Sequence, residues 1–353
     1  MSRVKAVQSK LKDSGVDALL ITSPYNLRYV SNFTGSTGLS VITKDKAYFV
    51  TDFRYTEQAA EQAEGFEIIK NTGSIYEEVK MITEKEGISA LGFEKDFVTF
   101  ATYDLLKSLL SAELKPVSGL IESLREVKEE AEIETIKQAI KITEYAFEEI
   151  LDYIKPGVSE IEVANRLDFL MREKGATGVS FDTIVASGKR SAMPHGVASE
   201  KLIEQGDMIT IDFGCYYKGY VSDMTRTFSL GDPGEELKKI HQIVLDANLK
   251  VTEQAKAGVT GKELDAVARD YITEKGYGEA FGHSTGHGIG LEVHEGPGIH
   301  FRNENKLVEG NVITNEPGIY IPGLGGVRIE DDLLITKDGN VNLMSVTKER
   351  IQL

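Results

Sequence analysis

Two segments of the chain, 101 residues apart, repeat one pattern of helix-terminating residues. Residues 155–175 and 256–276 are identical at seven of 21 aligned positions. Near its start, each copy has a hydroxyl residue and, three residues later, a glutamate, which together can form a capping box. Each copy ends with a glycine, which suits the left-handed residue after a helix. These residues are Ser159, Glu162 and Gly175 in the first copy, and Thr260, Glu263 and Gly276 in the second. Shared capping rules alone would explain two generic helices, but the additional identities favour duplicated α+β half-domains related by pseudo-twofold symmetry.

The chain before the repeat has a different organisation. Short apolar or β-branched stretches, expected as strands, alternate with amphipathic stretches expected as helices, which is typical of an α/β domain. The expected strands are 17–22, 40–43, 46–52 and 66–70, and the expected helices are 4–11, 55–63 and 74–86. A long charged helical region is expected at 122–154. Since 353 residues are too many for one ordinary core, we expect domains at 1–121 and 122–353 rather than one domain with an exposed helix.

Composition narrows the class of protein. The formal net charge of −16 disfavours nucleic-acid partners and anionic membranes, because both bind basic patches. No stretch approaches the ~20 apolar residues that a membrane-spanning helix needs. The first apolar cluster, residues 18–21, is too short for a signal-peptide core. The single cysteine, Cys215, rules out an intramolecular disulfide and a four-cysteine zinc site. We therefore expect a cytoplasmic protein.

Strand-like alternation on both sides of residues 215–219 predicts a β-hairpin that carries two carboxylates. A turn centred on Tyr217 and Lys218 pairs Asp212 with Asp223. Directly opposed residues have Cβ atoms about 4.5–5.5 Å apart on one face of the sheet. Two buried carboxylates at that separation need positive charge between them, supplied by a Lys or Arg, a shared proton or a metal ion.

A second hairpin is predicted around the turn-rich sequence of residues 322–326. A turn centred on Gly323 sets Glu316 opposite Glu330. One such pair alone would fit exposed charges on a solvated strand face. Two facing carboxylate pairs in the same part of the chain favour a metal site.

The histidines strengthen the case for a metal site. Three of them fall within 12 residues, on a glycine-rich stretch where backbone can approach a site closely. His283 and His287 have the spacing of a helical zinc motif, but the glycines argue against a helix and the motif's glutamate is missing. The four informative histidines are His195, His283, His287 and His294. We interpret the other two, His241 and His300, as structural.

Four carboxylates and one imidazole form an oxygen-rich ligand set. Such a set suits Mn²⁺ or Co²⁺ better than a metal that prefers thiolates, and Zn²⁺ is also compatible. Four acidic ligands can balance two divalent cations. Paired metal ions bridged by carboxylates are typical of hydrolases.

These motifs resemble the five-ligand set of the pita-bread metallopeptidases, a family that includes methionine aminopeptidase, aminopeptidase P, prolidase and creatinase. The matching motifs contain Asp212, Asp223 eleven residues later, His287 in Gly-His-Gly-Ile-Gly, Glu316 in Asn-Glu-Pro-Gly, and Glu330 in Arg-Ile-Glu-Asp. The first part of the chain resembles the smaller N-terminal domain of the proline-specific members and creatinase. The resemblance implies a creatinase-like α/β domain followed by a pita-bread α+β domain.

The resemblance also implies a role for each ligand. Asp212 would bind one metal with both oxygens. Asp223 and Glu330 would bridge the two metals. His287 and Glu316 would hold the other metal, and Glu316 would serve as general base toward the bridging water.

Four further residues match substrate-side positions of the family. His195 and His294 resemble the histidines that bind substrate and stabilise the tetrahedral intermediate. His283 matches a histidine on the leaving-group side. Arg328 resembles the arginine that orients the site.

The implied activity is hydrolysis of the Xaa–Pro bond with release of the N-terminal residue, by a homodimer. Many prolidases carry an arginine four residues after the histidine equivalent to His294, where it can hold the substrate's C-terminal carboxylate. This chain has Gly298 there, and Arg302 is nearby. The dipeptidase interpretation therefore stands beside aminopeptidase P activity on longer Xaa–Pro peptides. The filled ligand positions disfavour creatinase chemistry and a non-catalytic peptide-binding module. The native metal and the preferred first residue stay open.

Overall fold

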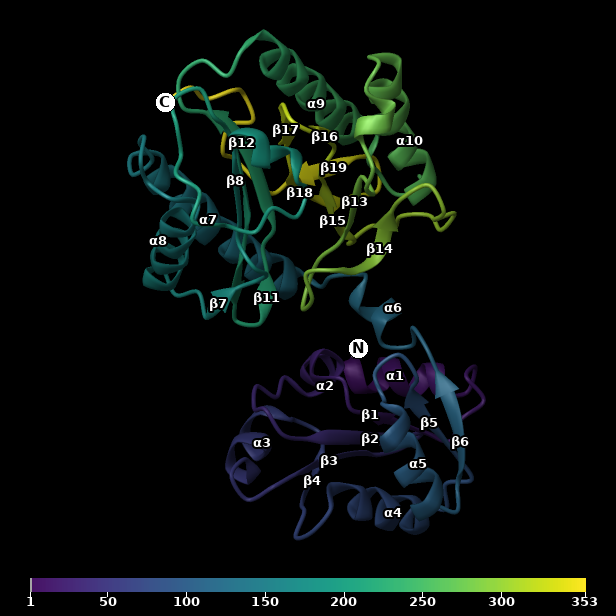
Figure 1. Cartoon of the computed structure of the whole chain (residues 1–353). Coiled ribbons are helices and arrows are strands. Elements are labelled where there is room, and N and C mark those ends of the chain that lie inside the picture. The colour runs from purple at the N-terminus through teal and green to yellow at the C-terminus, as the bar shows by residue number, and fades with distance from the viewer. Residues whose placement is uncertain (1) are drawn as a thin grey trace. The chain divides into compact units, whose positions relative to one another are not determined.

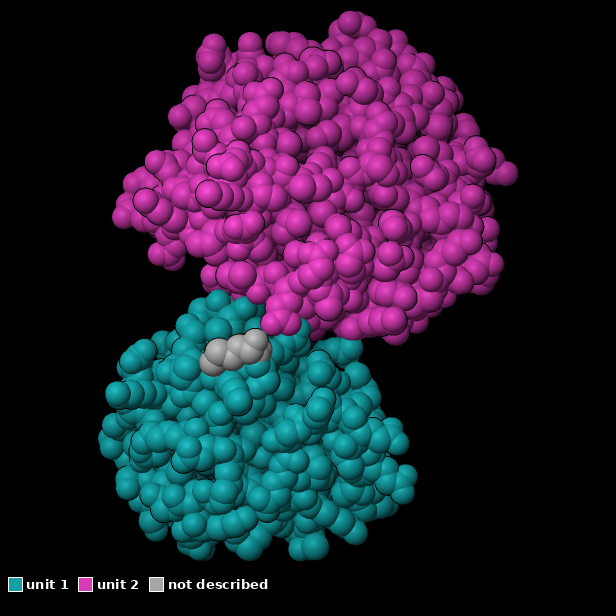
Figure 2. All heavy atoms as spheres, turned by 180° about the vertical axis from the view of Figure 1, so that it is seen from behind, with its two compact units in different colours: residues 1–125 teal, residues 126–353 magenta. Residues whose placement is uncertain are grey.

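The computed structural model describes residues 2–353. Contacts divide the chain into two compact units, residues 1–125 and 126–353, which Figure 2 colours separately. Within the described residues, every helix is too short or too polar to span a bilayer.

The first unit is a mixed β-sheet with helices on both faces, as the alternating pattern predicts (Figure 1). Its strand order is β4-β3-β2-β1-β5-β6. Helices α4 and α5 bury apolar side chains, among them Val79 and Leu106, against one face of the sheet. The strands are β1 (Ala18–Ile21), β2 (Leu39–Thr43), β3 (Ala47–Thr51), β4 (Glu67–Lys70), β5 (Ala90–Glu94) and β6 (Glu113–Val117). The helices are α1 (Arg3–Leu11), α2 (Pro24–Ser31), α3 (Thr56–Gln62), α4 (Ile75–Lys85), α5 (Phe100–Leu109) and α6 (Glu122–Arg125).

The second unit contains the repeat, and the predicted duplication is confirmed. Each half contributes a long helix followed by a shorter one, α7 (Glu130–Leu151) with α8 (Glu160–Glu173), and α9 (Glu235–Gln254) with α10 (Gly261–Glu274). The two shorter helices have equal lengths and begin 101 residues apart. Both predicted capping boxes form. Gly175 and Gly276 follow these helices with φ of 100° and 91°, the left-handed conformation that glycine tolerates.

Strands of both halves lie between the two helix pairs (Figure 1). One antiparallel sheet has the order β12-β9-β8, and a second has the order β14-β13-β15-β18-β19. The strands are β7 (Gly178–Val179), β8 (Ile184–Ser187), β9 (Met208–Phe213), β10 (Cys215–Tyr217), β11 (Tyr220–Val221), β12 (Met224–Ser229), β13 (Gly286–Gly288), β14 (Glu295–Ile299), β15 (Val312–Asn315), β16 (Gly318–Ile321), β17 (Gly325–Arg328), β18 (Asp331–Ile335) and β19 (Asn340–Asn342). Two short 3₁₀ turns are η1 (Gly188–Ala192) and η2 (Gly278–Ala280).

The first predicted hairpin has the wrong register. Asp212 pairs with Thr225, not with Asp223, because the turn is centred on Lys218 and Gly219. Both turn residues have positive φ, 48° and 86°, the geometry of a two-residue turn that matches strand twist. The predicted partner of Asp212 is therefore two residues away from the observed one. Since side chains alternate with period two, a slip of two keeps Asp212 and Asp223 on the same face of the hairpin.

The second predicted register is confirmed. The pairs Gly318 with Arg328 and Asn315 with Asp331 both continue the register that sets Glu316 opposite Glu330. These two glutamates occupy the break between the β15–β18 and β16–β17 ladders.

The expected helix over 122–154 is interrupted at residues 126–129. There the backbone N–H of Lys128 donates to the carbonyl of Gly310, and its ammonium group forms a buried ion pair with Glu295 at 2.6 Å. These contacts hold the segment outside a helix, and α7 begins only after Glu129.

Candidate metal centre

Strands from both halves of the second unit deliver the five predicted ligands. Asp212 lies in β9 and Asp223 directly precedes β12, so these carboxylates come from the first half. His287 lies in the middle of β13. Glu316 and Glu330 occupy the break between the two ladders of the second hairpin. His287 is not in a helix, as its glycine neighbours predict, and the structure places it in a strand.

The side chains of four of these residues converge. One ligand atom from each of Asp223, His287 and Glu330 lies within 4.8 Å of the other two. His287 Nε2 is 3.7 Å from Asp223 Oδ2 and 3.3 Å from Glu316 Oε1. The Asp223 and Glu330 side chains are buried. The structure therefore brings together the acidic groups that the two hairpins predict.

Asp212, the fifth residue, is oriented by an arginine. Arg328 Nη2 donates to Asp212 Oδ2 at 2.6 Å. The other oxygen, Oδ1, is buried and has no hydrogen-bond partner in the described chain. A buried carboxylate oxygen without a partner is costly unless another group uses it.

Burial, reinforced by the charges of neighbouring carboxylates, dominates the electrostatics of Asp223 and Glu330. Burial, followed by the charges of Glu330 and Asp212, raises the pKa of Asp223 well above its usual range. Burial, followed by the charges of Glu316 and Asp212, does the same to the pKa of Glu330. Without a cation these two carboxylates are therefore poorly stabilised as anions.

The pair formed by Glu316 and His287 behaves in the opposite way. Burial opposes ionisation of Glu316, but the hydrogen bond and charge of His287 outweigh it and lower the pKa of Glu316 to about 2. Burial also disfavours a charged His287, yet the hydrogen bond and charge of Glu316 raise the pKa of the imidazole. The charges of His283 and Arg328 lower the pKa of Glu316 further.

These observations fit divalent cations. The partnerless oxygen of Asp212 and the destabilised anions of Asp223 and Glu330 are the features that a bound cation would satisfy. Oxygen ligands with one imidazole suit first-row divalent ions. The donor set is therefore chemically suited to hold divalent metal ions.

The other predicted histidines lie beside the cluster. The His294 ring centroid is 4.3 Å from that of His287, and burial, together with the charge of His287, lowers the pKa of His294. Burial likewise lowers the pKa of His283. His195 is exposed, and it interacts electrostatically with both His283 and His294. All three histidines are thus near the same centre.

Two residues of the site were not predicted. The Tyr320 hydroxyl bonds to Arg328 Nη1 at 2.7 Å and to His283 Nε2 at 2.9 Å, so it links the arginine to the histidine. Thr225 Oγ1 donates to Glu330 Oε2 at 2.6 Å and accepts from Arg328 Nε. A signal for Tyr320 was available, because the register that pairs Gly318 with Arg328 also sets Tyr320 diagonal to that arginine.

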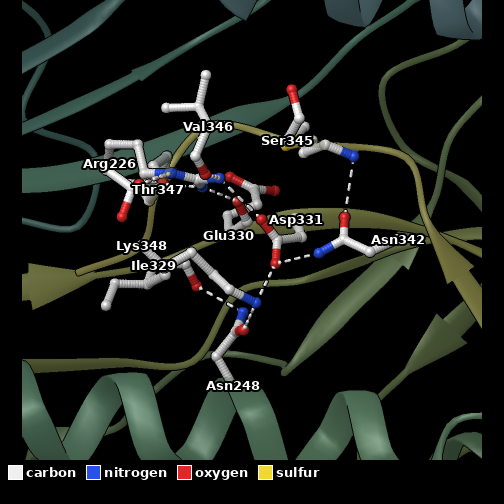
Figure 3. A network of polar contacts seen from close by, with 12 residues as sticks. Arg226, Asn248, Ile329, Glu330, Asp331, Asn342, Ser345, Val346, Thr347 and Lys348 are labelled. Carbon is white, nitrogen blue, oxygen red and sulfur yellow. Dashed lines mark hydrogen bonds and ion pairs between the residues drawn. The ribbon is translucent and has the colours of Figure 1, made fainter.

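A buried ionic network contacts the backbone carbonyl of Glu330 and the side chain of the next residue, Asp331 (Figure 3). Arg226 donates to the Glu330 carbonyl and forms an ion pair with Asp331 at 2.9 Å. Lys348 reaches the same aspartate at 2.5 Å and donates to Asn248 Oδ1 at 2.8 Å. The network thus ties the residue next to a predicted ligand to strand β12, helix α9 and the last residues of the chain.

Two residues outside this cluster, Cys215 and His241, have structural surroundings. Cys215 is buried against Thr143 and Ser222. His241 is buried on α9, with Nε2 3.1 Å from the carbonyl of Thr227. These contacts agree with the structural interpretation of His241.

Residues 134–337 match the model of Metallopeptidase family M24, and residues 3–127 match that of the Creatinase/Prolidase N-terminal domain. The chain is 43% identical to an Xaa-Pro dipeptidase from Pyrococcus horikoshii, over 99% of this chain and 98% of the relative. It is 54% identical to a solved Xaa-Pro dipeptidase from Bacillus anthracis, with a TM-score of 0.98 and 99% of each chain covered. A solved X-Pro aminopeptidase from Thermotoga maritima is 44% identical, with a TM-score of 0.91 and coverage of 96% and 98%.

Proposed function

The chain belongs to metallopeptidase family M24, and we propose that it is a metal-dependent dipeptidase that hydrolyses the Xaa–Pro bond. The observation that carries the proposal is the convergence of acidic residues from both hairpins with His287. Xaa-Pro dipeptidases that share 43% and 54% of its sequence support the substrate class. The two divalent ions of the proposed centre are Mn²⁺ or Co²⁺ by ligand chemistry, with Zn²⁺ as a further candidate.

In this proposal Asp212 would hold one ion, which would give its buried Oδ1 the partner that it otherwise lacks. Asp223 and Glu330 would each serve both ions, which would relieve the repulsion between their anions. His287 and Glu316 would hold the other ion. When bound, the ions supply Lewis acidity toward the scissile carbonyl and lower the pKa of a water molecule.

Side chains of the protein bind the substrate and transfer the protons. Glu316, whose low pKa keeps it ionised, accepts a proton from the attacking water. His195 and His294 bind the substrate and donate hydrogen bonds to the oxyanion that develops on the carbonyl. His283, fixed by the Tyr320 hydroxyl, faces the leaving-group side. Arg328 keeps Asp212 and Tyr320 in place.

The chemistry of proline explains why such a site is needed. The bond before proline is a tertiary amide, which has no N–H for an enzyme to bind. Polarisation of the carbonyl does not depend on that N–H. The departing proline nitrogen still requires a proton, which Glu316 or a neighbouring histidine returns to it.

A second candidate function is aminopeptidase P activity on longer peptides. The Thermotoga maritima X-Pro aminopeptidase is as similar as the archaeal dipeptidase. In addition, Gly298 replaces the arginine that could hold a dipeptide's carboxylate. A Cβ at this glycine would lie 2.7 Å from the His300 ring, and Arg302 is exposed.

The proposal also covers the catalytic domain, the oligomeric state and the location of the protein. All the predicted ligands fall within residues 122–353, the expected second domain, and we assign catalysis to it. We propose a homodimer from the family resemblance, and a cytoplasmic location in keeping with a single buried thiol.

A panel of substrates of different length tests the function. Turnover of Xaa–Pro, Xaa–Pro–Yaa and an Xaa–Ala control is compared with Mn²⁺, Co²⁺ and Zn²⁺ in turn. We expect cleavage of the Xaa–Pro dipeptide, with little cleavage of the control. A strong preference for the tripeptide would replace the dipeptidase assignment by aminopeptidase P, and absence of both metal binding and turnover would reject a peptidase.

A further inference from the structure

In the first half of the second unit, a buried carboxylate closes the base of the loop that carries His195. Glu160, the first residue of α8, is fully buried. Its Oε1 accepts from Ser187 N at 2.8 Å and Ser187 Oγ at 2.9 Å, and its Oε2 accepts from Ser199 N at 3.1 Å and Ser199 Oγ at 2.6 Å. Arg190, inside the loop, forms an ion pair with the same oxygen. Both ends of the loop are therefore fixed to one side chain.

In the second half, a buried carboxylate on the equivalent helix holds the stretch that carries His283 and His287. Asp265 of α10 is buried, and its Oδ1 accepts from Thr285 N at 3.1 Å and Thr285 Oγ1 at 2.8 Å. Arg269, one turn later, pairs with Asp265 at 2.8 Å. The same arginine donates to the carbonyl of His283 at 2.8 Å.

The two anchors are alike in chemistry but not in position. The repeat offset of 101 residues aligns Glu160 with Gly261, not with Asp265. A Cβ at Gly261 would lie 2.3 Å from the carbonyl of Gly298, so the second half has no room for a glutamate there. The anchor of the second half instead comes from the next turn of its helix.

We infer that Glu160 and Asp265 are positioning residues that hold the histidine-bearing loops of the two halves in register with the centre. The inference rests on the proposed function, because it gives these loops a role in catalysis. Glu160 accepts from Ser187 and Ser199 at the two ends of its loop. Asp265 Oδ1 accepts from Thr285 of the stretch it holds, while its Oδ2 accepts from Arg269 of the same helix. Replacement of one of these oxygens by an NH₂ group therefore leaves a buried donor without an acceptor.

The two anchors differ in what they hold, and this difference can be measured. The loop of Glu160 carries His195, a substrate-side residue, and none of the predicted ligands. The stretch of Asp265 carries the ligand His287 as well as His283. Loss of the first anchor should therefore disturb substrate binding alone, whereas loss of the second should also weaken metal binding.

Isosteric amides test the inference. In E160Q or D265N an NH₂ group replaces one oxygen and faces donors instead of accepting from them. Matched controls are E162Q and E263Q, on the same helices, where the carboxylates serve only the capping boxes. All four proteins are compared by Mn²⁺ titration calorimetry, by kcat and KM on an Xaa–Pro dipeptide, and by hydrogen exchange of the loop amides.

For D265N we expect Mn²⁺ affinity to fall by roughly 10–100-fold relative to E263Q, the usual effect of losing a group that orients a ligand. For E160Q we expect unchanged Mn²⁺ affinity, a KM raised about tenfold or more relative to E162Q, and faster exchange in residues 188–199. D265N with the affinity of its control, or E160Q with the KM and exchange of its control, would overturn the inference for that half.

Two milder variants cover the case in which an amide variant does not fold. Ser199→Ala and Thr285→Val each remove one hydroxyl donor to the anchor, and the same directions of change apply to them. Calorimetry and hydrogen exchange do not depend on turnover. If the wild-type protein failed to cleave Xaa–Pro peptides, the proposed function would be rejected while these two measurements still decided whether the anchors act.

Discussion

Arg328 Nη2 lies 2.6 Å from Asp212 Oδ2, and this contact fixes which oxygen of the aspartate remains available. The same guanidinium reaches the Tyr320 hydroxyl, Thr225 Oγ1 and the carbonyl of Pro194. A planar group with five donors can satisfy these acceptors together, whereas an ammonium group acts as a point charge. The orientation of Asp212 therefore depends on the shape of the arginine as well as on its charge.

Substitution of Arg328 by Lys should consequently impair the enzyme although the charge is retained. We expect kcat/KM on an Xaa–Pro dipeptide to fall by roughly 10–100-fold, the range found when a group that orients a metal ligand is lost. Arg172→Lys, at an exposed arginine of α8, is the control and should keep wild-type kinetics. Equal kinetics of the two variants would mean that Asp212 does not need this arginine.

Replacement of Glu316 by Ala should abolish turnover while the fold remains. The variant removes a ligand and the general base together, so metal analysis of the purified, Mn²⁺-reconstituted protein should find one of the two ions weakened. Glu309→Ala, at an exposed glutamate seven residues earlier, should retain both ions and activity. Persistent wild-type turnover in Glu316→Ala would remove that residue from the mechanism.

Replacement of His195 by Ala should separate substrate binding from metal binding. His195 is exposed and lies near the other histidines without belonging to the ligand cluster. We expect reduced turnover with unchanged metal content, measured on the same preparation by kinetics and metal analysis. Loss of metal from this variant would instead place His195 among the ligands.

The sequence predicted the part of the site that depends on period and chemistry. Alternation along strands assigned Asp212 and Asp223 to one face, and that assignment survived because the register error was an even number of residues. The turn itself was misplaced, because Lys218 adopts the left-handed conformation, which is unusual for a residue with a Cβ. Local sequence preferences therefore did not reveal the position of this turn.

The supporting contacts depend on tertiary structure and were less accessible. Asp265 and Glu160 look like ordinary charged residues of amphipathic helices, and only the fold brings them to loops 20 or more residues away. The interruption of the expected helix at residues 126–129 has the same origin, since it depends on the distant partner Glu295.

Removal of the metal should destabilise the protein more at high pH than at low pH. In the ion-free site the pKa values of Asp223 and Glu330 are raised above their unfolded values, so the stability they contribute is lost as pH rises through the folded pKa values. Bound Mn²⁺ requires the ionised carboxylates and therefore stabilises most at high pH. The difference in Tm between Mn²⁺-loaded and EDTA-treated protein should thus grow from pH 5.5 to pH 8. In Asp223→Asn the growth should be smaller.

His241 should make folding sensitive to acid independently of the metal. Burial is the main cause that lowers its pKa from 6.5 to about 4. Between these two values the unfolded chain binds a proton that the folded protein does not, so stability is complete above pH 6.5 and falls as the pH is lowered toward 4. A shift of this size corresponds to about 3 kcal/mol.

The matched comparison is wild type against His241→Gln, with urea unfolding in EDTA at pH 7, 6, 5 and 4. Asp223 and Glu330 contribute with the opposite sign in the ion-free protein, but they do so equally in both proteins and cancel in the difference. The free energy of unfolding of the wild type should therefore fall more steeply with acid than that of the variant. Parallel curves would mean that the His241 imidazole is protonated as readily in the folded protein as in the unfolded chain, and that its burial between α9 and the Thr227 carbonyl has no effect on its charge.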